Sequence, residues 1–237
     1  MKKDINFVVM KSKVLLYYAI VGLLTLGLFS CKKTEVKPVD LGYSYYPSNV
    51  GHWVLYDVDS TYYDQFHGTV TKSHFQIKEY FESTFLDNSN RPTQRLERYK
   101  QYDTVPFYLK DVWASNLTQS TAEKVEENVR FVKMIFPIAK GSTWNGNAFN
   151  TLNAQNYKYS NIFQPYTVNG NTFDSTVTVI QDIDTTNLLN AKNQVEIFAN
   201  HVGLIYKRYK DVTLLPPYND SIVGGVDYTM KIVAYGN

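Results

Sequence analysis

The side chains best suited to bind a metal ion in this sequence are its four histidines, His52, His67, His74 and His201. Zinc sites combine imidazole with thiolate or carboxylate ligands at short, regular spacings, and these histidines follow no such spacing. A hairpin around Gly68 could bring His67 and His74 together, with Asp64 as a third ligand. Surface histidines at strand ends explain the same pattern without a metal, so we predict no metal site and no cofactor.

Two pairs of acids stand two residues apart, Asp57 with Asp59 and Asp182 with Asp184. Side chains at this spacing share one face of a β-strand. Each pair could bind calcium, or supply acid–base catalysis if another acid stood opposite. A strand face in contact with water explains both pairs as well, and we favour it. The sequence has no nucleophile elbow, phosphate loop, His-Glu-x-x-His motif or dinucleotide fingerprint, so we predict that the protein is not an enzyme.

A short pattern recurs in which Asp is followed by Ser or Thr, and then by an aliphatic residue or Thr. It resembles the O-glycosylation acceptor of exported Bacteroidota proteins. The resemblance implies five candidate acceptors, Ser60, Thr104, Ser175, Thr185 and Ser221. Asp-Ser and Asp-Thr also mark turns and strand ends, so each site has a structural explanation too. Because the pattern recurs within one exported domain, we expect at least one modified residue.

An uncharged run near the start of the chain is typical of an export signal. Four lysines precede it, residues 14–29 form its apolar core, and small Ser30 stands before Cys31. Met10 offers a second translation start with a basic head of its own. Leu28-Phe29-Ser30-Cys31 resembles the lipobox of bacterial lipoproteins, although Phe29 is larger than the residue usual there. The resemblance implies cleavage before Cys31 and a lipid anchor on it, with acyl chains such as palmitate.

The alternative for this segment is an uncleaved helix that crosses the membrane once. Residues 14–30 are 17 residues long, at the short end of the roughly 17–25 that a bilayer requires. Cys31 is the sole cysteine, so the rest of the chain has no disulfide, thiol nucleophile or thiolate metal site. We predict a signal peptide at 1–30 and a lipid anchor in the outer membrane of a Gram-negative cell, on its periplasmic or outer side.

Removal of the signal peptide changes the charge of the chain. The full sequence carries a formal net charge of +2, and residues 1–30 contribute +3 from four lysines and one aspartate, which leaves −1. Without a stripe of lysine and arginine, binding to nucleic acid has no electrostatic support. Residues 31–41 are polar and lack periodicity, so we predict a tether. Residues 42–237 fit a single domain.

Alternation with a period of two dominates this domain and predicts β-strands. We expect strands at residues 54–59, 75–81, 91–102, 125–136, 157–163, 172–183, 194–199, 203–212 and 226–235. In the fourth of these strands, we expect Val129, Phe131 and Ile135 on one face. Arg130 and Lys133 are expected on the opposite face.

Turn and helix signals complete this interpretation. Asn169-Gly170-Asn171 predicts a hairpin turn, because Asn and Gly tolerate a positive φ. Short helices are expected at 116–127, where Ser120 and Glu123 offer a capping box, and at 185–191. The whole pattern predicts an all-β fold with minor short helices, in which an antiparallel sheet curves into a half-barrel or partly closed barrel.

An internal repeat joins an aromatic residue and proline to a glycine and a tryptophan, at residues 46–53 and 136–144. We interpret the copies as equivalent strand starts with buried Trp53 and Trp144, and the alternative is a ligand platform. Together with a later segment that contains Ala199 and Val202-Gly203-Leu204, the repeat resembles a loose group of bacterial lipoproteins of the kind found in the Bacteroidota. The resemblance implies a curved half-barrel like those of periplasmic lipoprotein and lipid carriers, which enclose an apolar hollow.

Three kinds of function are compatible with these features. We favour a non-catalytic module that binds a small apolar or amphipathic ligand, because strands such as residues 157–163 mix aromatic and polar side chains on both faces. The alternative is a surface interaction or structural lipoprotein with a filled core. An enzyme is the third. The lipid anchor makes the membrane a partner, and the sequence names no protein partner.

Overall fold

The computed structural model describes residues 39–184, 186–216 and 218–237. Contacts divide the chain into two units, Met1–Val39 and Asp40–Asn237, and the features below belong to the second. In its described residues, a short 3-10 turn, η2 (Tyr43–Tyr45), is followed by strands. Cys31, the predicted signal peptide and most of the predicted tether lie outside the described residues.

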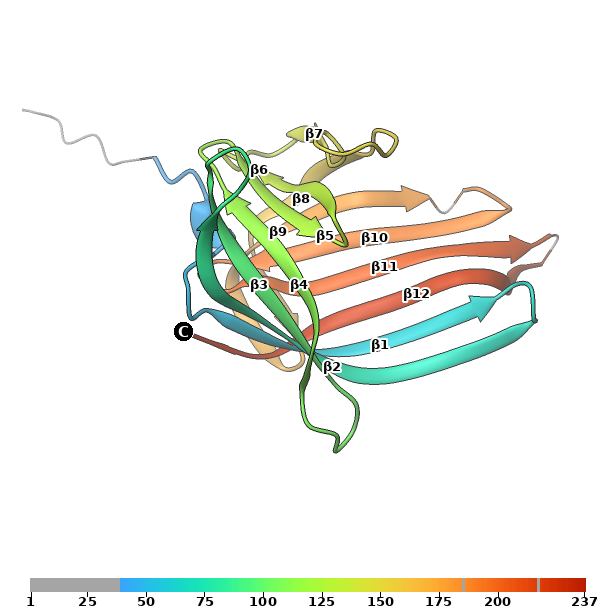
Figure 1. Cartoon of the computed structure of the whole chain (residues 1–237). Coiled ribbons are helices and arrows are strands. Elements are labelled where there is room, and N and C mark those ends of the chain that lie inside the picture. Colours follow the sequence, from blue (N-terminus) through green and yellow to red (C-terminus); the bar gives the residue numbers. More distant parts are fainter. Residues whose placement is uncertain (1–38, 185, 217) are drawn as a thin grey trace, which may run out of the picture. The chain divides into compact units, whose positions relative to one another are not determined.

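In this part of the chain, twelve strands form one antiparallel sheet (Figure 1). Their bounds are β1 (Trp53–Asp64), β2 (Thr69–Leu86), β3 (Pro92–Gln101), β4 (Tyr108–Leu117), β5 (Thr121–Glu126), β6 (Val129–Ile135), β7 (Thr143–Asn145), β8 (Asn156–Val168), β9 (Asn171–Asp184), β10 (Asn190–Ala199), β11 (Gly203–Leu215) and β12 (Tyr218–Gly236). Strands that follow one another in the chain are neighbours in the sheet, except at β6 and β7, which form its two edges. β12 pairs with β1. The predicted antiparallel all-β fold is confirmed.

The sheet curls until its two edges approach each other. Val132 N of β6 donates to Gly146 O at 2.9 Å, and the indole of Trp144 donates to Val132 O at 2.9 Å. Tyr159 adds a third link, because its hydroxyl donates to Ile135 O at 2.6 Å. These bonds join the two edges, so the sheet forms a nearly closed barrel. The prediction of a partly closed barrel is confirmed.

Apolar side chains at alternate strand positions fill part of the barrel. Tyr56 and Val58 of β1 point inward, beside Ile77 of β2 and Met230 of β12, and all four are at most 2% exposed. Full burial of such a side chain contributes about 1.5–3 kcal/mol. The Tyr56 hydroxyl donates to Leu204 O at 2.9 Å, so burial of this polar atom carries no unsatisfied hydrogen bond.

The segment before β1 crosses one end of the barrel. The Tyr46 hydroxyl lies 3.0 Å from Ser115 Oγ on β4, and the Tyr45 hydroxyl lies 2.6 Å from Ser175 Oγ on β9. Both tyrosines are buried. Because β4 and β9 lie far apart in the order of the sheet, these hydrogen bonds let the segment bridge two distant parts of the curled wall.

The tip of the β8–β9 hairpin packs on the outer face of the sheet. Asn169 and Gly170, with φ of 48° and 75°, form the turn predicted from the sequence. The Asn169 side-chain amide donates to Ile232 O at 2.9 Å. Phe173 packs beside Tyr235, with ring centroids 6.3 Å apart. The hairpin therefore adds a smaller hydrophobic contact outside the barrel.

The two short helices predicted from the sequence are wrong. Residues 116–127 form the end of β4, all of β5 and the start of a turn, in which Glu127 and Asn128 have φ of 48° and 65°. Glu123 of the proposed capping box lies in β5 and accepts a 2.7 Å bond from Arg130 of β6. Residues 186–189 form bends and irregular backbone, and β10 begins at Asn190. Pairing with neighbouring strands outweighs a local capping signal.

The two copies of the repeat occupy different environments, contrary to their predicted equivalence. Trp53 opens β1 in the middle of the sheet, where the ammonium of Lys78 lies 4.8 Å from its ring centre. Trp144 lies in edge strand β7 and packs against Tyr159, with ring centroids 4.7 Å apart. Both tryptophans are half-buried rather than buried. The repeat marks the start of a strand in both copies. The contacts of each tryptophan depend on where that strand lies in the sheet, which differs between β1 and β7.

Candidate functional site

The histidines considered as metal ligands lie apart from each other. His67 is in the β1–β2 turn, with Nδ1 2.6 Å from Asp64 Oδ2. His74 is on β2, with Nδ1 2.9 Å from Asp59 Oδ1 on β1. His67 and His74 therefore each have a carboxylate partner of their own, whereas His52 bonds to Asn237 Oδ1 and Val202 O. Within the described ranges, no three His, Cys, Asp or Glu side chains are grouped as a metal ion would require.

The paired aspartates take part in local hydrogen bonding. Asp57 accepts a 2.8 Å bond from Gln76 Nε2 across β1 and β2. Asp184 accepts backbone N–H groups of the turn before β10. Asp182 forms an ion pair with Lys192 at 3.4 Å and lines the cavity described below. The two members of the 182/184 pair thus have different roles.

The five candidate glycosylation residues differ in accessibility. Thr104 in the β3–β4 loop and Ser221 in β12 are exposed. Ser60 is half-buried in β1, and Ser175 is half-buried in β9, where its hydroxyl bonds to a tyrosine. Thr185 lies outside the described residues. Modification stays a prediction, and Thr104 and Ser221 are its most accessible acceptors.

Charged side chains inside the barrel form two clusters that the sequence analysis did not predict. The Glu79 cluster consists of Glu79, Arg98, Asp111 and Lys124, on β2 to β5. Arg98 Nε lies 3.0 Å from Glu79 Oε1, and Lys124 Nζ lies 3.1 Å from Glu79 Oε2. Arg98 also contacts Asp111 at 2.9 Å and stacks 3.7 Å from the ring centre of Trp113. Two positive and two negative groups balance, as buried ions require.

The Glu196 cluster consists of Glu126, Lys133, Glu196 and Lys207, on β5, β6, β10 and β11. Lys133 Nζ lies 3.1 Å from Glu126 Oε1 and 2.9 Å from Glu196 Oε1. Lys207 Nζ lies 3.1 Å from the same Glu196 oxygen. Since β6 and β10 are not neighbours in the sheet, the cluster joins two walls of the barrel through its interior.

The ion pairs keep this second cluster charged. Burial alone raises the pKa of Glu196, but the ammonium groups of Lys133 and Lys207 outweigh it and lower this pKa to about 2. Burial also raises the pKa of Glu126, but the nearby ammonium of Lys133 has a larger effect together with the other lysines, so the pKa of Glu126 is lowered. In return, Glu126 and Glu196 overcome the burial of Lys133 and raise its pKa. At neutral pH Glu126, Lys133 and Glu196 therefore carry full charges.

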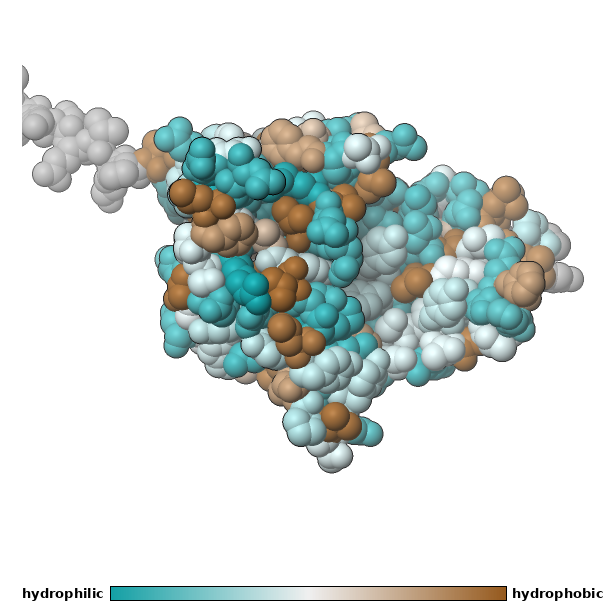
Figure 2. All heavy atoms as spheres, viewed as in Figure 1, coloured by the Kyte–Doolittle hydropathy of each residue, from teal (hydrophilic) through white to brown (hydrophobic). Residues whose placement is uncertain are grey.

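A cavity of about 470 Å³ opens beside the Glu196 cluster, between β5–β6 and β9–β11. Its charged lining residues are Glu126, Lys133, Asp182, Lys192, Lys207 and Asp211. Figure 2 shows a hollow in this part of the surface, bordered mainly by hydrophilic side chains. The resemblance found in the sequence implies an apolar hollow, whereas the lining of this cavity is largely polar.

Amide and aromatic side chains complete the cavity wall. Gln155 Nε2 donates to Gln194 Oε1 at 3.1 Å, which links the residue before β8 to β10. Phe131, Tyr157 and Tyr209 contribute rings. Burial raises the pKa of Tyr157 to about 12, so its hydroxyl is neutral and able both to donate and to accept.

Two buried polar atoms at this site have no hydrogen-bond partner among the described residues. One is Nε2 of Gln181, which lines the cavity from β9 and is 7% exposed. The other is Oε2 of Glu196, whose Oε1 contacts both lysines of the cluster. An unsatisfied buried polar atom costs about 1–3 kcal/mol. Such atoms are uncommon in folded proteins and indicate a place where a further polar group fits.

The alternation of side chains along the strands could have indicated this site, because it places charged residues at inward positions. Glu79 stands between Ile77 and Phe81 at inward positions of β2. Lys133 follows Phe131 by two residues, so both side chains lie on the same face of β6, and both line the cavity. The prediction that Lys133 faces away from Phe131 is therefore wrong. Side chains alternate between the two faces of a strand whatever their charge, so a charged residue can face inward.

Comparison with solved structures finds a distant match. No family model matches the sequence, and no curated protein matches it. The structure of a candidate lipoprotein from Parabacteroides distasonis ATCC 8503 aligns with 81% of this chain and 98% of its own length, at a TM-score of 0.40 and 9% sequence identity. A similarity of this degree supports no inference about function.

Proposed function

We propose that this protein is a non-catalytic binding module, held at a membrane by lipid on Cys31, that takes up a small polar molecule in the cavity beside the Glu196 cluster. The observation that carries the proposal is a cavity of about 470 Å³ lined by charged and amide side chains. In its wall, Gln181 Nε2 has no hydrogen-bond partner among the residues that the structure describes. Small-molecule sites of roughly 300–1,000 Å³ use a few placed polar groups to orient the ligand.

The lining changes the kind of ligand expected from the sequence. An apolar or amphipathic molecule would displace water from the charged and amide groups without replacing their hydrogen bonds. Each polar group left unpaired in this way costs about 1–3 kcal/mol. A polar ligand restores those bonds, so the cavity favours a polar ligand over the apolar or amphipathic one expected from the sequence.

Charge pairing also favours binding over catalysis. Glu126 and Asp182, two carboxylates of the lining, each face a lysine, at 3.1 Å and 3.4 Å. A general acid needs a raised pKa, whereas Lys133 lowers that of Glu126. The arrangement suits a wall that holds a molecule in place.

A variant that blocks the cavity tests the binding proposal. Ala154 is exposed and lines the cavity, so Ala154→Trp should fill the mouth without disturbing the core. Native mass spectrometry of protein purified from its own host should show a bound small molecule on the wild type and not on this variant. Ala148→Trp, at an exposed position of the same loop outside the lining, should retain the molecule. A bare wild type, or equal occupancy of both variants, would contradict the proposal.

The anchor is proposed on the sequence, with Cys31 following the apolar run. In the part of the chain that the structure describes, no helix is long and apolar enough to cross a membrane. We expect wild-type protein to enter the detergent phase on phase partitioning, and Cys31→Ser to remain unprocessed or to enter the aqueous phase. Ser89→Ala, in an exposed turn, is the control and should behave as wild type. If Cys31→Ser has the same mass as the wild-type polypeptide without lipid and is retained in the membrane fraction equally with wild type, an uncleaved spanning helix is favoured instead.

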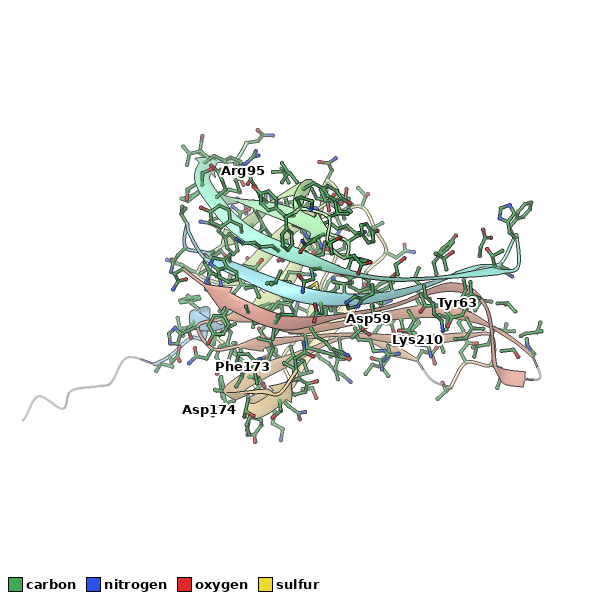
Figure 3. The ribbon with its side chains drawn as sticks, turned by 90° about the horizontal axis from the view of Figure 1, so that it is seen from below. Asp59, Tyr63, Arg95, Phe173, Asp174 and Lys210 are labelled. Carbon is green, nitrogen blue, oxygen red and sulfur yellow. The ribbon has the colours of Figure 1, made fainter. Side chains whose placement is uncertain are left out.

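A second candidate function is the docking of a protein strand, which matches the surface interaction role considered from the sequence. In the described pairing, residues 108–113 of β4 bond to β3, and β5 joins β4 only from Ala114 onward. A groove of about 690 Å³, lined by Phe85, Val112 and Arg95 among others, lies beside this edge. Figure 3 shows Arg95 on the opposite side of the β1–β12 layer from Phe173 and Asp174 of the β8–β9 hairpin. An exposed strand edge beside a groove is suited to strand addition.

A further inference from the structure

The lysines of the cavity wall already have carboxylate partners. Lys133 and Lys207 share Glu196, at 2.9 Å and 3.1 Å, and Lys192 lies 3.4 Å from Asp182. With Glu196 counted, four carboxylates face three lysines, and each of these groups already has a partner of opposite charge, because Asp182 and Asp211 share Lys192. A ligand with a net charge would therefore lose water without gaining a free counter-ion. The pairing therefore favours a ligand that carries no net charge.

The same wall mixes hydrogen-bond donors with acceptors. Gln181 offers a donor that has no partner within the described part of the chain. Gln155 and Gln194 add a bonded pair of amides, and Tyr157 and Tyr209 are tyrosines of the lining. A ligand hydroxyl donates one hydrogen bond and accepts two. A molecule with several hydroxyl groups can thus bond to both the donors and the acceptors of the wall. A carboxylate group can only accept hydrogen bonds, and an ammonium group can only donate them.

The aromatic rings and the volume of the cavity narrow the class of ligand further. Phe131, Tyr157 and Tyr209 present rings to the cavity, and such rings bury the flat C–H face of a sugar while tyrosine keeps a polar tip. The volume of about 470 Å³ lies in the lower part of the range for small-molecule sites, roughly 300–1,000 Å³. Resting on the binding function proposed above, we infer that the ligand is a neutral saccharide, a mono- or disaccharide, held by Gln181 and the tyrosines.

Titration calorimetry with a panel of sugars tests this inference. The full chain is purified in a detergent without sugar head groups, and the panel contains neutral mono- and disaccharides, glucuronate, glucosamine and decanoate. At least one neutral saccharide should bind, and its charged counterpart should bind about tenfold more weakly or not at all. Binding of a charged or apolar compound with no binding of any neutral saccharide overturns the saccharide and leaves the binding function standing. No binding across the whole panel overturns the saccharide as well, and the Ala154→Trp comparison then decides the binding function separately.

Two variants locate the bound sugar. Gln181→Leu removes the unpaired donor and Tyr209→Phe removes one hydroxyl, so each should weaken binding about tenfold while the melting temperature stays near that of wild type. Gln164→Leu, at an exposed position of β8 outside the lining, should bind as wild type does. If Gln181→Leu does not fold, Tyr209→Phe alone decides. Unchanged affinity in the folded cavity variants would place the sugar elsewhere and overturn the inference.

Discussion

Replacing Lys133 with Met should lower the free energy of unfolding by about 3–5 kcal/mol, the range for removal of one member of a buried ion pair. Lys133 is 5% exposed and contacts both Glu126 and Glu196. Met is close to Lys in length, but it leaves the half-buried Glu126 and the fully buried Glu196 without this ammonium group. These carboxylates must then stay charged with fewer partners or take up a proton. Urea unfolding followed by circular dichroism measures the loss.

A matched control separates burial from charge. Lys158→Met removes an exposed lysine from β8 and should change stability by no more than about 0.5 kcal/mol. Adding Glu126→Gln to Lys133→Met should recover part of the loss, because it removes the unpaired charge. A loss below about 1 kcal/mol for Lys133→Met would show that water, rather than the ion pairs, stabilises these carboxylates.

Replacing Trp144 with Ala should cost about 3 kcal/mol, toward the lower end of the values for truncation of a packed aromatic residue. Its ring packs against Tyr159, and its indole donates to Val132 O where the two edges of the sheet meet. The variant therefore loses packing and one of the bonds that close the barrel. Its urea unfolding midpoint should fall without a change in the far-ultraviolet β signal.

Trp53→Ala is the matched comparison for this closure. Trp53 belongs to the other copy of the repeat, but it is half-buried on β1 and packs beneath Lys78. Its truncation should cost about 1 kcal/mol, the centre of the distribution for point substitutions. Equal losses at the two tryptophans would restore the equivalence that the repeat suggested and would contradict the special role of Trp144 at the edge.

The buried charges help to explain why the barrel retains a polar cavity. Small barrels usually fill their interior with apolar side chains. Here Glu196 is fully buried and satisfied on one oxygen by Lys133 and Lys207, and ion pairs require a fixed geometry that apolar contacts do not. Apolar side chains cannot collapse into this region without separating those pairs.

Local patterns were enough to predict most of the strands and the turn at Asn169-Gly170. Alternation at residues 54–59 or 203–212 depends only on neighbours in the chain, because side chains in a strand change face at each residue. The turn depends on the tolerance of two residues for positive φ, which is a property of those residues themselves. The same reasoning predicts an antiparallel, curved all-β sheet, and the structure confirms it.

The site was decided by tertiary structure. Lys133 and Glu196 are 63 residues apart, and they meet because the sheet curls until β6 faces β10, which no local pattern reveals. A charged residue at an inward position is indistinguishable in sequence from one on a solvated face until its partner is known, since burial is tolerable only with a counter-ion at hydrogen-bond distance. Tertiary structure also explains why the capping box at Ser120 and Glu123 does not start a helix. A helix cap stabilises only its own segment, whereas β5 forms hydrogen bonds with both β4 and β6.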